Sequence, residues 1–250
     1  MIHSVLIIGQ SNMSGRGYPS EAPQISFKDI KVLRNGRWQN AYRPIVADRV
    51  TSGVCLAETF ARKYADEHPG IEVGIIPCSD GGTSLTQWRE GGLLYDNTVY
   101  QTRLALRTST VVAVLWHQGE ADCGDEKYPL YYERALAIFE ALRRDLDLYD
   151  VPFILGGLGD FLKHRTESPQ LVNYPYVNGH LMRIAEKPYY AYADASGLGA
   201  NSDNLHFNAV SLHEFGYRYY DAFKKIEKTD RAFAEKLAPN DAVRTAMEAL

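Results

Sequence analysis

Short apolar runs alternate along the chain with stretches of helical periodicity. Five runs of four to eight residues follow this pattern, and each leads into a glycine-rich or polar turn. They cover residues 5–8, 71–76, 111–116, 151–155 and 189–193. Their hydrophobicity is continuous rather than alternating, which is typical of strands buried on both faces of a parallel sheet. The pattern therefore predicts a mostly parallel, five-stranded sheet.

Helical patterns lie between these runs. Within residues 56–67, Leu56, Phe60 and Tyr64 recur at steps of four, so they fall on one side of a helix. Residues 131–148 place a longer apolar stripe in the same way, and similar patterns cover 177–186 and 210–226. Strands that alternate with helices imply parallel βαβ units. We therefore predict a three-layer α/β/α sandwich.

Two segments interrupt the alternation. Between residues 30 and 38, Asn35-Gly36 separates two short apolar runs and predicts a hairpin between the first strand and the first long helix. From residue 228 onward the chain is charged and favours helix. There is no internal repeat and no evident linker. We expect one domain over residues 1–227 and a C-terminal helical tail over residues 228–250.

Composition narrows the class of protein. The chain has 250 residues, of which 45% are hydrophobic, and a formal net charge of −4. This is the composition of a folded globular protein without the basic excess of a nucleic-acid binder. The longest apolar runs are far shorter than the roughly 20 residues that span a bilayer. We expect no nucleic-acid or membrane partner, and leave a homo-oligomer open.

Three cysteines without metal-like or CxxC spacing favour a reducing compartment, with the thiols as small buried groups. The first residues lack the cationic start and long apolar core of a secretory signal. A cytoplasmic location is the simplest interpretation. A mature fragment whose signal was removed stays as the alternative.

Polar clusters follow the apolar runs, and in a parallel sheet such clusters meet at one edge. The first cluster runs from Gly9 to Gly15 and places Ser11 two residues beyond a buried strand, where its hydroxyl can face a ligand. A phosphate-binding turn or a simple helix cap are the plainer interpretations. A Walker loop is excluded because no Gly-Lys-Ser/Thr follows, and Met13 breaks the G-x-S-x-G elbow.

The other clusters supply a base and hydrogen-bond donors. Asp203 stands three residues before His206, close enough to orient one ring nitrogen while the other faces outward as a base. Gly81-Gly82 allows a backbone amide to approach a ligand, and Gln118 places a side-chain amide at a strand end. Taken singly, each pattern is as well explained by a surface carboxylate, a tight turn or a buried polar residue.

Together, these motifs resemble a known family. The ordered set is Gly9-Gln-Ser-Asn-Met13, Gly81-Gly-Thr-Ser84 with Trp88, His117-Gln-Gly-Glu120 and Asp203-x-x-His206. It resembles the SGNH-hydrolase superfamily, within it the carbohydrate acetylesterases of the sialate O-acetylesterase-like and family-six acetylxylan esterase-like groups. The resemblance covers roughly residues 5–220. It implies a flavodoxin-like α/β/α sandwich and a serine esterase that removes O-acetyl groups from a carbohydrate without a cofactor or metal.

The resemblance also implies roles for individual residues. Ser11 would be the nucleophile, His206 the general base and Asp203 its orienting partner. The oxyanion hole would consist of the Ser11 amide, a glycine amide and the Gln118 side chain, with Gly82 preferred to Gly81. Gln118 departs from the wider superfamily, which has an asparagine in a G-x-N-D motif. Residues expected to support this machinery or contact substrate are Gln10, Asn12, Gly81, Glu120, Trp88 and Arg16.

Two other functions stay open at this point. The first is a metal-dependent hydrolase, with ligands drawn from His117, Glu120 and Asp122, joined by Cys78 or Cys123 and by Asp203 and His206. The second is a non-catalytic module that binds an acetylated glycan or a nucleotide.

Aromatic and basic residues near the expected site bear on the substrate. Trp38, Tyr42 and Trp88 are candidates for stacking on a sugar, and Arg16 and Arg89 for contacting an acidic sugar, although a solvated surface role is the plainer interpretation of the arginines. We expect the partner to be a small acetylated saccharide or another acetyl ester.

Overall fold

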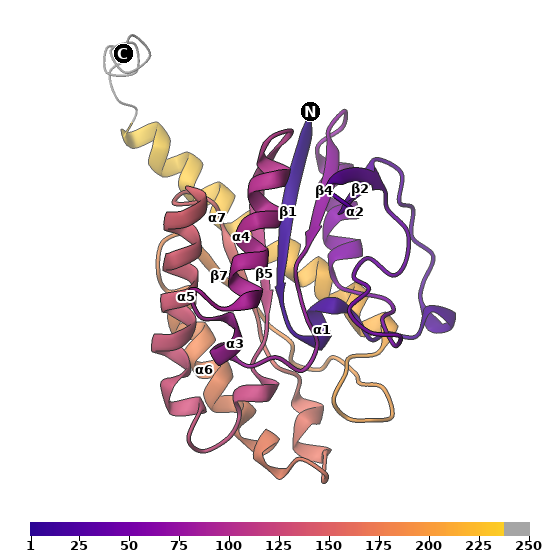
Figure 1. Cartoon of the computed structure of the whole chain (residues 1–250), viewed down its shortest axis with the longest axis vertical. Coiled ribbons are helices and arrows are strands. Elements are labelled where there is room, and N and C mark those ends of the chain that lie inside the picture. Colours follow the sequence, from indigo (N-terminus) through magenta and orange to yellow (C-terminus); the bar gives the residue numbers. More distant parts are fainter. Residues whose placement is uncertain (238–250) are drawn as a thin grey trace.

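The computed structural model describes the backbone of residues 1–237 and the side chains of residues 1–226. Within them, seven strands form a single sheet in the order β3-β2-β4-β1-β5-β6-β7 (Figure 1). Every neighbouring pair is parallel except β2 and β3. The strands are β1 (Ile2–Gly9), β2 (Ile30–Arg34), β3 (Arg37–Asn40), β4 (Glu72–Pro77), β5 (Ser109–His117), β6 (Phe153–Gly156) and β7 (Tyr190–Ala193).

The five apolar runs form the strands that the sequence predicts. β1 occupies the centre of the sheet between β4 and β5, and Val5, Leu6, Ile7 and Ile8 are at most 1% exposed. Both faces of this strand are covered, which explains its uninterrupted hydrophobic run. The expectation of an α/β sandwich with a mostly parallel sheet is confirmed.

The expected strand count was too low because the hairpin joins the sheet. Asn35 and Gly36 both adopt positive φ angles, 51° and 73°, as a two-residue turn requires. β2 and β3 pair antiparallel across this turn, and Val32 of β2 then pairs in parallel with Ile75 of β4. Two further strands thereby extend one edge of the sheet.

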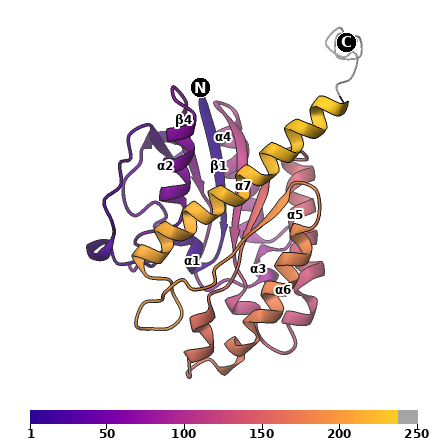
Figure 2. The same ribbon diagram turned by 180° about the vertical axis from the view of Figure 1, so that it is seen from behind.

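Helices cover both faces and complete the three layers (Figures 1 and 2). α7 crosses one face obliquely with α2 beside it, and α4 and α5 cover the other face, where α6 packs beside α5 on β6 and β7. The helices are α1 (Ser11–Ser14), α2 (Ala57–Glu67), α3 (Leu85–Trp88), α4 (Leu93–Leu106), α5 (Tyr131–Leu146), α6 (Tyr174–Ala185) and α7 (Ala209–Leu237).

The apolar stripe of α2 faces α7, as its spacing predicts. Phe60 meets Tyr220 and Phe223 of α7 edge-on, at ring-centroid distances of 5.5 Å and 5.8 Å. Tyr64 contacts the same two rings. Aromatic pairs of this geometry contribute about 0.5–1.5 kcal/mol each beyond the area they bury. This cluster holds the two helices together on one face of the sheet.

The helix α7 passes through the expected domain boundary at residue 227 and continues to Leu237. The predicted tail over residues 228–250 lies partly outside the described residues, since positions 238–250 are not described. The division into a domain and a tail stays a prediction.

The three cysteines, Cys55, Cys78 and Cys123, are unpaired and buried, as expected for small core residues. Burial raises the pKa of each thiol, so these side chains stay protonated near neutral pH. No helix within residues 1–237 is long and apolar enough to cross a membrane.

Candidate active site

The end of β1 presents Ser11 at the carboxyl edge of the sheet. Gly9 has a φ of +133°, and a Cβ there would lie 2.0 Å from the carbonyl oxygen of His117. Only glycine allows the ends of β1 and β5 to approach this closely. The Gln10 amide then donates to that same carbonyl at 2.8 Å. Ser11 follows as the first residue of α1 and is 6% exposed.

Ser11, His206 and Asp203 form one hydrogen-bonded chain. His206 Nε2 lies 3.0 Å from Ser11 Oγ, and His206 Nδ1 lies 2.6 Å from Asp203 Oδ2. A carboxylate accepts only, so Nδ1 carries the hydrogen, and in the neutral imidazole Nε2 accepts from the serine hydroxyl. Residues 195 positions apart in the chain are thus in the arrangement of a nucleophile, a base and an orienting group.

The loop that carries Asp203 fixes the carboxylate. Its Oδ1 accepts the backbone amides of Leu205 and His206 at 2.9 Å and 3.0 Å. Burial raises the pKa of Asp203, but these amides and the His206 ring outweigh it, and the pKa lies below its usual value. Asp203 is therefore a stable anion at neutral pH. Arg165 Nη1 donates to the Asp203 carbonyl oxygen at 2.6 Å and so restrains the backbone of this loop.

Asn12 links the nucleophile turn to the histidine loop. Its Oδ1 accepts the Phe207 amide at 3.0 Å, which fixes the orientation of the side-chain amide. Its Nδ2 then donates to the Leu205 carbonyl at 3.2 Å and to Glu120 Oε1 at 2.5 Å. Asn12 is 1% exposed. It is a buried bridge between three segments and makes no surface that a substrate could reach.

Glu120 and Gln10 support the same region from the segment after β5. Glu120 is 5% exposed, and its Oε2 has no hydrogen-bond partner among the described side chains and backbone. Gln10 Oε1 accepts the amides of Gly119 and Ala121 at 3.3 Å and 3.4 Å. Both side chains tie the nucleophile turn to the 117–121 segment.

The structure distinguishes between the two glycines of the 81–82 turn. A Cβ at Gly81 would lie 3.5 Å from Ser11 Cβ, so this turn packs directly against the nucleophile. The Gly81 amide is already engaged, since it donates to Asp48 Oδ2 at 2.8 Å. Gly82 has a φ of +78° and no atom within 4 Å of the Cβ it would carry. Its amide has no hydrogen-bond acceptor within the described part of the chain, which leaves it available to a ligand.

The structure differs from the expectation at Gln118. Its Nε2 donates to Asp122 Oδ2 at 2.5 Å and to the Thr83 carbonyl at 3.2 Å, so both amide hydrogens are engaged inside the protein. Burial raises the pKa of Asp122, opposed by hydrogen bonds from the Leu85 amide and Gln118. Gln118 thus braces the glycine turn through Thr83 rather than presenting a free donor. Its residue type alone did not reveal these partners.

Trp88 and Arg16 also make contacts within the protein. Trp88 is fully buried, and its indole N–H donates to Thr83 Oγ1 at 2.9 Å, so it supports the glycine turn and cannot stack on a sugar. Arg16 is 8% exposed and forms an ion pair with Asp48. Arg16 is therefore not a solvated surface arginine, and its contact with an acidic sugar stays a prediction.

The other candidate substrate residues are Trp38, Tyr42 and Arg89, and the structure gives their positions and contacts. Trp38 lies on β3 and donates to Thr108, beside the start of β5 and away from Ser11. Tyr42 is exposed and packs against the Arg34 guanidinium, and Arg89 is exposed.

The residues of the metal hypothesis are not gathered into a ligand set. Within the described residues, no group of three or more His, Cys, Asp or Glu side chains is arranged to hold a metal ion. His117 is fully buried, its Nε2 lies 3.1 Å from the Gly157 carbonyl, and burial lowers its pKa.

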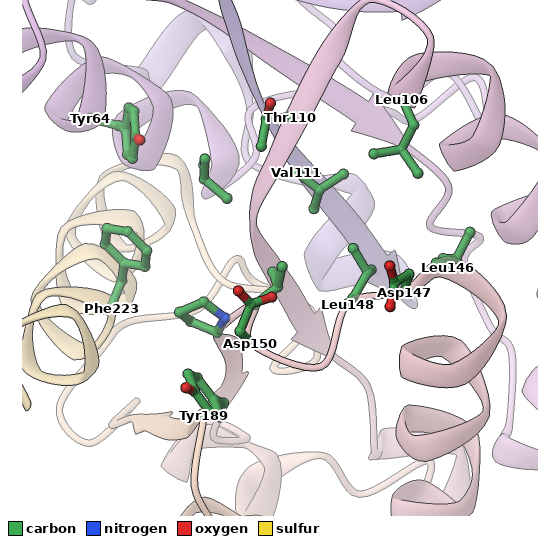
Figure 3. Close-up of a pocket in the computed structure, with 13 residues that line it drawn as sticks. Tyr64, Leu106, Thr110, Val111, Leu146, Asp147, Leu148, Asp150, Tyr189 and Phe223 are labelled. Atoms are coloured by element: carbon green, nitrogen blue, oxygen red, sulfur yellow. The ribbon is translucent and has the colours of Figure 1, made fainter. Parts of the chain in front are cut away.

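A cavity of about 700 Å³ lies at the opposite end of the sheet (Figure 3). Thr110 and Val111 line it from the start of β5, and Tyr189 and Pro152 from the residues just before β7 and β6. These are the amino ends of the strands, whereas Ser11 follows a carboxyl end. The cavity contains no residue of the hydrogen-bonded chain described above.

Several residues that shape this site carried no signal in the sequence. Asp48, Arg49 and Arg165 lie in irregular segments and match no motif. Asn201 belongs with them: its Nδ2 donates to the Arg16 carbonyl at 2.9 Å, and its amide donates to the His206 carbonyl. Only tertiary contacts identify this group.

Comparison with known proteins places the chain in a family. The sequence model of the carbohydrate esterases described as sialic acid-specific acetylesterase matches residues 2–225. A probable carbohydrate esterase of Arabidopsis thaliana is 29% identical over 251 residues, which cover 87% of this chain and 88% of the relative.

Solved structures show the same fold. A crystal structure of an Arabidopsis thaliana protein superposes with a TM-score of 0.80 at 25% identity and covers 89% of this chain and 98% of its own. NanS gives a TM-score of 0.71 at 20% identity, with 91% and 98% covered. A carbohydrate acetylesterase from Xanthomonas citri gives 0.65 at 17% identity, and the match covers 90% of this chain and 56% of that one.

Proposed function

The chain belongs to the sialic acid-specific acetylesterase family of carbohydrate esterases, and from that premise we propose that it removes O-acetyl groups from a carbohydrate through a Ser-His-Asp acyl-enzyme mechanism. One observation carries the proposal. Ser11 Oγ lies 3.0 Å from His206 Nε2, while Asp203 holds the other ring nitrogen at 2.6 Å. This is the contact distance that a nucleophile and its general base need.

In the first step His206 takes the proton of the Ser11 hydroxyl as its oxygen attacks the acetyl carbonyl carbon. The carbonyl oxygen becomes an oxyanion, and the free Gly82 amide and the Ser11 amide are the donors proposed to stabilise it. Gln118 was expected to be a third donor, but it acts in this proposal by holding Thr83 behind Gly82. The oxyanion then collapses, the bond to the sugar oxygen breaks, and His206 returns the proton to that oxygen.

In the second step a water molecule replaces the sugar. His206 removes a proton from the water, whose oxygen attacks the acetyl-Ser11 carbonyl, and the same amides face the second oxyanion. The oxyanion collapses, the bond between the acetyl carbon and Ser11 Oγ breaks, and His206 returns the proton to Ser11 Oγ. Acetic acid leaves and ionises to acetate. Asp203 remains ionised throughout and stabilises the imidazolium that forms in each step.

The substrate is proposed to be a small acetylated saccharide. A neutral ester requires no strongly charged surface for capture, and the net charge of −4 is modest. We also propose a cytoplasmic location, because three unpaired, buried cysteines suit a reducing compartment. Cell fractionation tests the location, and recovery of the active protein only outside the cells would contradict it.

The variant Ser11→Ala tests the chemistry. Hydrolysis of p-nitrophenyl acetate and of acetylated oligosaccharides should fall by about 10⁶-fold, as when the nucleophile of a triad is removed. Ser14→Ala is the matched control, because Ser14 is a buried serine of the same helix whose hydroxyl donates to Ser79 instead of to a base. Full activity in Ser11→Ala would refute the proposal, and circular dichroism should show both variants folded.

A panel of substrates then addresses specificity. Acetate release is measured with acetylated xylo-oligosaccharides, O-acetyl sialic acid and simple aryl acetates. Faster release from a saccharide than from the aryl ester is the expected result, and release from the aryl ester alone would contradict a carbohydrate substrate.

A further inference from the structure

The loop between β3 and α2 holds both backbone polar groups of Gly81. Asp48 Oδ2 accepts the Gly81 amide at 2.8 Å, and Arg49 Nη2 donates to the Gly81 carbonyl oxygen at 3.0 Å. Arg49 also donates through Nη1 to Asp80 Oδ1 at 2.8 Å. Two consecutive residues of opposite charge therefore fix the turn that packs against Ser11.

These hydrogen bonds to Gly81 determine the direction of the Gly82 amide. The Gly81 carbonyl and the Gly82 N–H belong to one peptide group, which is trans, because Arg43–Pro44 is the only cis bond in the described chain. In a trans peptide these two groups point in opposite directions. Holding the carbonyl toward Arg49 consequently turns the N–H away from Arg49. Without that contact, a turn between two glycines can rotate the peptide at low cost.

Asp48 is itself firmly positioned. Arg16 binds both of its carboxylate oxygens, at 3.1 Å and 2.7 Å, and Ser52 donates to Oδ1 at 2.8 Å. Burial raises the pKa of Asp48, but the hydrogen bonds from Arg16 and Ser52 more than offset it, so the pKa lies below its usual value. The side chains of Arg16 and Asp48 are 8% and 5% exposed. The acceptor for Gly81 is thus a buried carboxylate that is ionised at neutral pH.

We propose that Asp48 and Arg49 are positioning residues for the oxyanion hole, because together they orient the Gly81–Gly82 peptide so that the Gly82 amide faces the acetyl oxygen at Ser11. The inference rests on the proposed esterase function. Neither residue touches the reacting atoms. Arg49 has a second effect, because a cation on the carbonyl polarises the peptide and strengthens its N–H as a donor.

Arg49→Met is the most direct test. The Arg49 side chain is 51% exposed, so its removal should leave the fold and melting temperature unchanged. Arg144→Met is the matched control: its side chain is 52% exposed and also pairs with two acceptors, Glu90 and Asp145. We expect kcat on an aryl acetate to fall by about tenfold in Arg49→Met, a part of the 10²–10³-fold lost with a whole oxyanion donor. KM should change less than twofold, and Arg49→Lys should recover part of the loss.

A sulfur-substituted ester separates positioning from a merely structural role. In the corresponding aryl thionoacetate, sulfur replaces the carbonyl oxygen and is a weak hydrogen-bond acceptor. The native enzyme should prefer the oxygen ester strongly. Loss of the Gly82 donor affects the oxygen ester most. In Arg49→Met, the kcat/KM of the oxygen ester divided by that of the thionoacetate should therefore fall by about the same factor as kcat on the oxygen ester. Asp48→Asn should lower the ratio further.

The outcomes are distinct. An unchanged ratio and an unchanged kcat in Arg49→Met, with Ser11→Ala inactive, would overturn the positioning proposal and leave the esterase function intact. Equal loss on both esters would assign the loop a structural role only. Full activity in Ser11→Ala would instead refute the function on which this proposal rests.

Discussion

Replacing Asn12 by aspartate changes one buried group and little else. Asn12→Asp keeps the size of the side chain and the oxygen that accepts the Phe207 amide. It converts the Nδ2 donor into a second oxygen, which then faces Glu120 Oε1 across 2.5 Å. Asn12 is 1% exposed, so water cannot separate the two carboxylates.

The expected loss of stability follows from comparing two states of the folded variant. Either both carboxylates are ionised, or one of them is protonated. Two unit charges 2.5 Å apart repel by about 7 kcal/mol at an effective dielectric constant of 20. Taking up one proton at pH 7 costs about 3.7 kcal/mol for a carboxyl whose ordinary pKa is about 4.3. Proton uptake is the cheaper outcome and also restores a donor. The variant should therefore be less stable than the native protein by about 3.7 kcal/mol at pH 7 and about 1 kcal/mol at pH 5.

The sign of the pH dependence is fixed by linkage. The folded variant binds a proton that the unfolded chain releases, so its pKa is raised in the folded state. The stability of the variant relative to the native protein is therefore highest below the unfolded pKa. Above that pKa it falls by about 1.4 kcal/mol for each pH unit. Urea denaturation of the variant and the native protein between pH 5 and pH 8 measures this slope.

A second substitution provides the control. Glu120→Gln in the Asn12→Asp background places an amide donor opposite the new carboxylate. It should remove most of the pH dependence and recover about 2 kcal/mol at pH 7. The reasoning is refuted if the stability loss of the single variant is independent of pH, or if the double variant is no more stable than the single one.

The remaining predictions concern the turn before Ser11 and the orienting carboxylate. Gly9→Ala should prevent stable folding, because its Cβ would lie 2.0 Å from a backbone oxygen. Gly179→Ala, in α6, should instead stabilise the protein by up to about 1 kcal/mol, because no atom lies within 4 Å of the added Cβ. Thermal melts of the two variants measure the difference. Asp203→Asn should lower kcat by about 10⁴-fold, measured by acetate release with the melting temperature as control. Since the pKa of Asp203 is depressed in the folded state, its contribution to stability should be present above about pH 4 and disappear as pH falls below it, which acid-unfolding curves of both proteins would show.

The sequence determined the elements that depend on local patterns. Continuous apolar runs identified the central strands, since strands covered on both faces need no polar alternation. The Asn35-Gly36 pair identified the hairpin because few other residues accept two positive φ angles. The sequence did not reveal that the hairpin joins the sheet, which depends on a pairing between Val32 and Ile75. It also missed α4, whose inward side includes Thr98 and Thr102 and thus lacks a clear apolar stripe.

At the site, sequence order alone grouped Ser11, Asp203 and His206, because residues after parallel strands gather at one edge of the sheet. The hydrogen bonds that give each group its role were decided by tertiary structure. Asp48 accepts the Gly81 amide, whereas the Gly82 amide has no acceptor in the described part of the chain. Asp122 and the Thr83 carbonyl engage both hydrogens of the Gln118 side-chain amide, so Gln118 braces the turn and offers no free donor. A side chain's type limits what it can donate or accept. Which partner it finds depends on distances between segments far apart in the chain, and only the folded structure sets those distances.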